Sequence, residues 1–404
     1  MKRIIFLVCC LCLIAFTQSD NSTWVQKADF GGGKIYDAAS FVIGNYAYVA
    51  TGCNYVGFPY GGSKQRFMYR YDPSSDVWKR MADLPPAGAA TFEAVGFAIG
   101  EKGYVCGGVG NAALWEYDPS TNLWYQRINC PHVIEEGIGF AISSKAYVGL
   151  GGASIIDYKN DFYEYDPSKN KWTQLNDFPG APRRGSIGFS MDGKGYAGLG
   201  YKDIGSYNKG YFKDLWEYDP LTDDWTRLPD FPGEARQDAI GFGIDGAIYV
   251  GMGGINDFYK YDLKSKEWST LNYIPGSSRV YAFSFCIGSG IYYGGGMSPN
   301  LASDMWKYSI GSVTFVAKKP EIEDFKCFPN PVIDLLEIEM PENHKIAKIN
   351  VTDMSGKVVV IYENNNNMIT HKDINLSSFK NGYYTITIED QDRNLFTKKL
   401  LKSK

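Results

Sequence analysis

Three arginines recur at matching positions of an internal repeat, and their side chains are well suited to bind a ligand. Arg183, Arg236 and Arg279 each stand six residues before a phenylalanine that opens a similar segment. A guanidinium group offers paired N–H donors that match a carboxylate or a sulfate. The three arginines could therefore hold an anion if the repeats bring them to one surface.

A second, mostly acidic set follows two residues later, and it comprises Asp37, Glu93, Glu136, Gly185, Asp238 and Tyr281. A carboxyl group beside an arginine can donate or accept a proton, so Glu136 or Asp238 with Arg183 or Arg236 would suit acid–base chemistry. The alternative is structural, with arginines of some repeats paired to acids of others. A further repeated acid is more typical of a strand-start cap than of a metal ligand: Asp161, Asp214, Asp257 and Asp304. The sequence therefore predicts no metal, no cofactor and no assigned catalytic residue.

Six copies of one aromatic pattern organise the region that carries these residues. A phenylalanine is followed seven residues later by a tyrosine and four residues after that by a glycine, as in Phe41, Tyr48 and Gly52. A second tyrosine comes after a loop of variable length, and seven residues later stands a tryptophan, except in the last copy, where it is Phe315. Asp192-Gly193 and Asp245-Gly246 are strong hairpin turns between the first two strands.

Four short antiparallel strands repeated six times predict an all-β, six-bladed β-propeller over residues 20–316. The strand around Trp24 or the one around Phe315 could close the ring, and the better match of Trp24 to the other copies favours the first. Closure matters because a ring leaves only short, protected strand edges.

The pattern resembles the kelch family, through the glycine pairs Gly107-Gly108, Gly151-Gly152 and Gly253-Gly254 and the repeated Tyr-Asp-Pro segments. The resemblance implies a kelch-type propeller. Loops after strands two and four share one face, and they vary in length, which is typical of a binding surface. The tyrosines expected there are Tyr36, Tyr55, Tyr60, Tyr158, Tyr201, Tyr207, Tyr211 and Tyr281.

Residues 1–19 have the pattern of a secretory signal peptide, with Lys2 and Arg3 before an apolar run that is too short to span a membrane. No other stretch predicts a transmembrane segment. Five cysteines remain after the peptide, which is neither a disulfide framework nor a zinc pattern, although one bridge could form.

A different domain follows a polar linker at residues 317–324. Residues 325–404 alternate as short strands, over 335–340, 346–353, 358–362, 383–389 and 396–401, and predict a small Ig-like β-sandwich. The segment resembles the type A sorting domain of the type IX secretion system, through Phe328, Pro329, Asn330, Pro331, Asp353, Gly356, Lys357, Gly382 and Tyr383. The resemblance implies that residues 325–404 bind the type IX machinery and that the protein is secreted or held at the outer surface of a Gram-negative cell. The alternative is an Ig-like appendage that binds another molecule.

Composition excludes several function classes. The net charge of −4 provides no basic surface for nucleic acid. Copper radical oxidases with a kelch propeller need two histidines, and the propeller region holds only His132. We therefore expect a secreted or cell-surface binding module for an extracellular glycan or protein. The alternative is a sugar mutarotase of the kelch type that acts on sialic acid.

Overall fold

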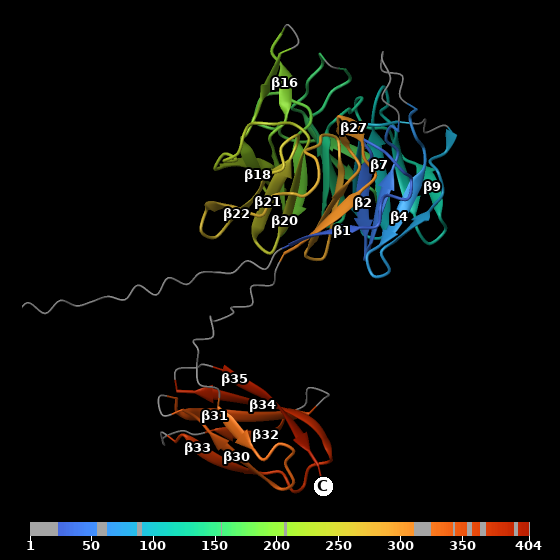
Figure 1. Ribbon diagram of the computed structural model, residues 1–404. Coiled ribbons are helices and arrows are strands. Elements are labelled where there is room, and N and C mark those ends of the chain that lie inside the picture. Colours follow the sequence, from blue (N-terminus) through green and yellow to red (C-terminus); the bar gives the residue numbers. More distant parts are fainter. Residues whose placement is uncertain are drawn as a thin grey trace, which may run out of the picture. The chain divides into compact units, whose positions relative to one another are not determined.

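The computed structural model describes residues 23–54, 63–86, 91–154, 156–205, 208–310, 325–341, 344–353, 358–363, 369–391 and 395–403 (Figure 1). The chain divides into two compact units, one of which holds the described residues up to 310 and the other those from 325 onward.

The first unit consists of six four-stranded antiparallel sheets, which are the blades of a propeller. Blade one contains β2 (Ala39–Ile43), β3 (Tyr46–Ala50), β4 (Met68–Asp72) and β5 (Val77–Arg80). Blade two contains β6 (Ala94–Ile99), β7 (Lys102–Gly107), β8 (Leu114–Asp118) and β9 (Leu123–Gln126). Blade three contains β10 (Ile138–Ile142), β11 (Lys145–Gly149), β12 (Phe162–Asp166) and β13 (Lys171–Gln174).

The other three blades follow the same order. Blade four contains β14 (Ile187–Met191), β15 (Lys194–Gly198), β18 (Leu215–Asp219) and β19 (Asp224–Leu228), with an inserted hairpin of β16 (Tyr201–Asp203) and β17 (Lys209–Tyr211). Blade five contains β20 (Ala239–Ile244), β21 (Ala247–Met252), β22 (Phe258–Asp262) and β23 (Glu267–Thr270). Blade six contains β24 (Phe283–Ile287), β25 (Gly290–Gly294) and β28 (Met305–Ser309), and its loop carries β26 (Met297–Ser298) and β27 (Asn300–Leu301).

The N-terminal strand β1 (Thr23–Lys27) closes the ring as the fourth strand of blade six. It pairs antiparallel with β28, with Trp24 opposite Tyr308. The predicted closure through Trp24 is therefore confirmed, and Phe315 lies outside the described residues.

Aromatic residues of the repeat pack between neighbouring blades. The ring of Tyr71 in blade one lies 5.7 Å from that of Tyr292 in blade six. Trp78 Nε1 donates to the carbonyl of Ala28, which follows β1 of the preceding blade, at 3.2 Å. Burial of these large rings excludes water from the blade interfaces and supplies much of the stability of the ring.

A turn residue with positive φ strengthens the same interfaces. Asp76 has a φ of 56°, a conformation that Asp and Asn tolerate better than most residues. Its Oδ1 accepts hydrogen bonds from the Tyr71 hydroxyl at 2.7 Å and from the Ala28 amide of the neighbouring blade at 3.0 Å. One short side chain thus links its own blade to the preceding one.

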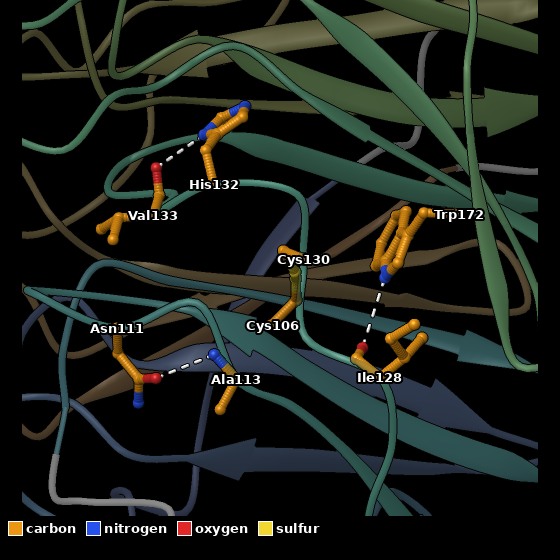
Figure 2. Close-up of a disulfide and its surroundings, with 8 residues drawn as sticks. All are labelled: Cys106, Asn111, Ala113, Ile128, Cys130, His132, Val133 and Trp172. Atoms are coloured by element: carbon orange, nitrogen blue, oxygen red, sulfur yellow. Dashed lines mark hydrogen bonds between the residues drawn. A yellow bond between two sulfur atoms is a disulfide. The ribbon is translucent and has the colours of Figure 1, made fainter.

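A disulfide joins Cys106 on β7 to Cys130 in the loop that leaves blade two (Figure 2). Cys130 occupies the repeat position where other blades bury an apolar side chain, such as Phe178 and Phe231. The sequence analysis allowed for one disulfide among the five remaining cysteines, and the Cys106–Cys130 bridge is present.

The second unit is a β-sandwich of two sheets, in the orders β29-β30-β33 and β32-β31-β34-β35. The first sheet contains β29 (Lys326–Phe328), β30 (Leu335–Glu339) and β33 (His371–Asn375). The second contains β31 (Ile346–Asp353), β32 (Val358–Glu363), β34 (Gly382–Asp390) and β35 (Leu395–Lys402). The predicted strands are present, and β29 and β33 are additional. The predicted all-β class, a six-bladed propeller followed by a sandwich, is confirmed.

Candidate functional site

The loops that precede the first strand of each blade meet the loops after the second strand on one face of the propeller. Short backbone bridges join them within four blades: Tyr36 to Cys53, Glu135 to Gly152, Arg184 to Tyr201 and Val280 to Met297. The β16–β17 hairpin projects from this face (Figure 1). The expectation that the variable loops share one face is therefore confirmed.

The three repeat arginines are buried and fully engaged. Arg183, Arg236 and Arg279 are only 1 to 3% exposed. Each binds the carboxylate of the acid before the third strand of its own blade through both terminal nitrogens: Asp214, Asp257 and Asp304. We call these pairs the arginine clamps.

Backbone carbonyls complete each clamp. Nη1 of Arg183 also donates to the carbonyl of Leu199 at 3.0 Å, and Nε donates to that of Ala181 at 2.8 Å. The same contacts recur for Arg236 and Arg279. The acids of the clamps lie in the same blade as their arginines, so the predicted pairing of arginines with acids of other repeats is wrong for these three residues. Their donors are used within the fold, and we do not include them in the ligand site.

The acidic set forms a ring around the mouth of the central channel. All six positions have positive φ, between 49° and 62°. Backbone amides of Asp37, Glu93, Glu136, Gly185 and Asp238 donate to the carbonyl of the equivalent residue in the preceding blade at 2.9 to 3.2 Å. This hydrogen-bonded belt holds the side chains around a single opening, which we call the acidic mouth.

A cavity of about 170 Å³ lies at the acidic mouth, lined by the side chains of Asp37, Glu93, Glu136, Asp238 and Tyr281. It shares six small residues with the central channel, a cavity of about 410 Å³ between the inner strands: Ala38, Ala94, Gly137, Ser186, Ala239 and Ala282. The mouth is therefore the point where the channel opens on the face of the variable loops.

Arg184 links the acids of different blades and was not predicted. Its Nη2 lies 2.7 Å from Glu93 Oε2 and 3.2 Å from Glu135 Oε2, and its Nε lies 3.6 Å from Glu136 Oε2. Among the described residues, Arg184 Nη1 and Glu136 Oε2 have no hydrogen-bond partner although both atoms are buried. The mouth thus keeps unused hydrogen-bonding capacity where buried polar atoms are normally satisfied.

Burial and mutual repulsion raise the pKa values of the acids at the mouth. Burial raises the pKa of Asp37 and of Asp238 well above the usual range, and neighbouring carboxylates add to the effect. Burial, followed by the charge of Glu136, raises the pKa of Glu93 to about 8. Glu93 consequently holds its proton near neutral pH and can both donate and accept hydrogen bonds.

Aromatic and amide side chains border the acids. The rings of Tyr36 and Tyr281 lie 6.1 Å apart. Gln237 Nε2 donates to Asp238 Oδ2 at 2.5 Å, and Lys209 donates to Gln237 Oε1 at 2.7 Å. The Lys209 ammonium also sits 3.9 Å above the ring of Tyr201. The rim therefore supplies flat apolar surface beside a polar cavity.

Apart from the arginines of the clamps, the predicted ligand residues separate into three groups. Glu136, Asp238, Tyr36, Tyr201 and Tyr281 come together at or beside the mouth, with the ring of Tyr158 lying 6.1 Å from that of Tyr201. Tyr211 is exposed on β17. Tyr55, Tyr60 and Tyr207 lie outside the described residues.

Lys209 and Gln237, like Arg184, were not singled out from the sequence. The doublet Arg183-Arg184 and the pair Gln237-Asp238 place each of them next to a repeat position.

In the C-terminal unit, the described sequence motif residues lie at the start of the domain, at the end of β31 and at the start of β34. Asn330 Oδ1 accepts from the Leu401 amide at 2.9 Å, and its Nδ2 donates to the Lys399 carbonyl at 3.1 Å. Gly382 opens β34 opposite Lys402. Asp353 ends β31, and Tyr383 and Phe328 are exposed, while Gly356 and Lys357 lie outside the described residues.

Comparison with known families identifies the C-terminal unit. Residues 326–403 match the secretion system C-terminal sorting domain. The fold of the chain is similar to the solved structure of YjhT, a β-propeller, with a TM-score of 0.58 and 15% identity over 69% of this chain and 95% of that one. No curated protein matches the sequence.

The sorting domain defines the location of the protein. It directs export through the type IX system, so the protein is secreted or lies at the outer surface of a Gram-negative cell. Within the part of the chain that the structure describes, no helix is long and apolar enough to cross a membrane.

Proposed function

We propose that the propeller is a kelch-type binding module that takes a neutral sugar of an extracellular glycan into its acidic mouth. The observation that carries the proposal is the set of acidic side chains on the belt. Positive φ costs roughly 1–2 kcal/mol for most residues with a side chain, Glu93 and Glu136 among them, and Gly185 meets the same backbone demand without that cost. Burial of carboxyl groups with raised pKa values is a second unfavourable feature. Residues that lower stability both through their backbone conformation and through a buried carboxyl group are expected where they bind a ligand.

The chemistry of the mouth favours hydroxyl groups. Carboxyl oxygens accept hydrogen bonds from sugar hydroxyls, and the protonated forms can also donate. Tyr36 and Tyr281 supply flat rings against which the apolar face of a sugar can pack. A cavity of about 170 Å³ suits one small ring rather than a protein surface, so a glycan is favoured over a protein ligand.

Charge argues for a neutral sugar rather than sialic acid. The mouth gathers the carboxyl groups of Asp37, Glu93, Glu136 and Asp238, and each one that is ionised would repel the carboxylate of an acidic sugar. Arg184 already faces three carboxylates, and the arginine clamps use the other guanidinium groups.

A glycan array probed with the secreted protein tests this proposal. We expect binding to neutral glycans by the wild-type protein and loss of that binding in Asp238→Asn. Asp230→Asn is a matched control because Asp230 is an exposed acid paired with Arg227 on the surface. Exclusive binding of sialylated glycans, or equal binding by Asp238→Asn, would show that the mouth is not the site.

Sugar mutarotation is a second candidate because Glu93, with a pKa of about 8, could transfer protons near neutral pH. Pairs of Glu136 or Asp238 with Arg183 or Arg236 do not support it, since those arginines are held in clamps. Proton NMR of freshly dissolved sugars distinguishes the candidates: accelerated anomer exchange indicates an enzyme, and binding without acceleration indicates a binding module.

We also propose that residues 325–404 bind the type IX machinery directly. Deletion of residues 322–404 should leave the propeller inside the cell envelope, as measured by fractionation and surface proteolysis. Undiminished surface delivery of the shortened chain would overturn this role and would favour an Ig-like appendage that binds another molecule.

A further inference from the structure

We propose that the acidic mouth holds the terminal unit of a glycan and that a groove beside blades four and five holds the units that follow, so that the protein recognises chain ends. This inference rests on the proposed function and adds the part of the glycan that is recognised. It is carried by two further cavities that lead away from the mouth.

The first cavity, of about 240 Å³, is lined by Lys209, Tyr211, Gln237, Ile255 and Val280, among others. Gln237 and Val280 directly precede Asp238 and Tyr281 of the mouth. The Gln237 amide donates to the Asp238 carboxyl group, so this cavity begins where the acidic mouth ends.

The second cavity, of about 520 Å³, continues from the first. Both are lined by Ala235 and Ile255, and the second extends to Lys213, Glu234 and Tyr259. We call the two cavities together the blade-five groove.

The blade-five groove carries side chains that suit a sugar chain. Tyr211 is 46% exposed on the β16–β17 hairpin and offers a ring to solvent. Ile255 and Tyr259 add apolar surface, while Lys213 and Glu234 offer hydrogen bonds at the outer end. Alternating flat apolar and polar contacts match a chain whose units each have apolar faces and polar edges.

The shape of the mouth explains why an end would be selected. The hydrogen bonds of the belt run from Tyr281 through blades one to four to Asp238, so a unit held among the four acids can continue into the groove that begins beside Asp238 and Tyr281. An internal unit would need a second exit for the other half of its chain.

Binding of neutral oligosaccharides of increasing length tests the inference. Calorimetry would use the full secreted protein with mannose, galactose, glucose and N-acetylglucosamine oligomers of one to six units. We expect affinity to rise at least 10-fold from one unit to four, because successive units fill the groove. A bulky fluorophore placed on one end of the best oligomer should abolish binding, and the same label on the other end should not.

Two variants separate the mouth from the groove. Tyr211→Ala should remove most of the gain with length and leave single-unit binding unchanged, whereas Tyr125→Ala, a change at a 41% exposed tyrosine on β9, should alter neither. Affinity independent of length, or binding with either end blocked, would overturn chain-end recognition while keeping the mouth as a site. Failure of every oligomer to bind would overturn the proposed function and this inference together.

Discussion

The arginine clamps and the acidic mouth lie two residues apart in the repeat, yet they differ in almost every physical respect. Arg236 is buried against Asp257 with each of its three nitrogens engaged. Asp238, two residues later, shares a cavity with three other carboxyl groups and has a raised pKa. A paired charge marks a structural position here, and a cluster of carboxyl groups without a matching set of cations marks a candidate binding position.

The comparison also shows how a repeat can separate two roles. The clamps occur in blades four to six, where Arg183, Arg236 and Arg279 replace the Ile35, Thr91 and Ile134 of blades one to three. The belt runs through all six blades, but its side chains differ from blade to blade. The backbone geometry is common, and the chemistry at the mouth is set by individual side chains.

Breaking an arginine clamp should have the largest effect, and this effect should be on the free energy of unfolding. Arg236→Met leaves Asp257 buried without its partner, and loss of one member of a buried pair typically costs about 3–5 kcal/mol. Chemical denaturation of the secreted protein would measure the loss of unfolding free energy. Arg227→Met removes a surface partner of Asp230 and should cost less than about 1 kcal/mol. Equal costs for the two variants would show that the clamp is not structural.

A change at the mouth should affect binding instead. Asp238→Asn should lower glycan affinity at least 10-fold, about 1.4 kcal/mol, because the acceptor pair of the carboxylate is lost. Its unfolding free energy at pH 8 should stay the same or rise, since an amide cannot ionise in a site where burial disfavours the charged form. A large fall in stability with no change in affinity would show that Asp238 has a structural role and does not bind the ligand.

The pH dependence of stability should carry opposite signs in the two regions. Glu93 keeps its proton up to about pH 8 in the folded protein, against an ordinary value of 4.5, so the folded state binds more protons between these pH values. Unfolding free energy should therefore fall as pH rises through this window. The pKa of Asp304 is lowered by Arg279, despite burial, so its contribution is lost only as the solution becomes strongly acidic.

Glu93→Gln isolates the contribution of the mouth. Denaturation at pH 5 and at pH 8 should show a smaller difference for this variant than for the wild-type protein, by on the order of 1 kcal/mol. If the variant and the wild-type protein showed the same difference in unfolding free energy between pH 5 and pH 8, Glu93 would titrate near its ordinary value. The mouth would then be more hydrated than the structure shows.

The repeat made the architecture predictable and also concealed part of the site. Invariant aromatic spacings define strands and blades, and the match of Trp24 to the other tryptophans was enough to predict the closing strand. The clamps were not predicted because variable loops separate each arginine from its acid by 21 to 31 residues. Arg184 was missed because a residue present in one blade leaves no periodic pattern.

The disulfide shows the same limit of prediction from the sequence. Cys130 stands where other blades carry Leu84, Phe178 or Phe231, so its position is a repeat position but its chemistry is not. Which side chains differ at a shared backbone position can be read from the sequence. Which of them meet in space depends on how the loops pack within a blade and between blades, and this required the structure.

A crystal structure of the secreted protein with a neutral oligosaccharide tests the central claim most directly. We expect the terminal unit within hydrogen-bonding distance of Asp37, Glu93, Glu136 and Asp238, with the arginine clamps unchanged. A sugar bound elsewhere on the propeller, or one that displaces Asp214, Asp257 or Asp304 from its arginine, would contradict the account.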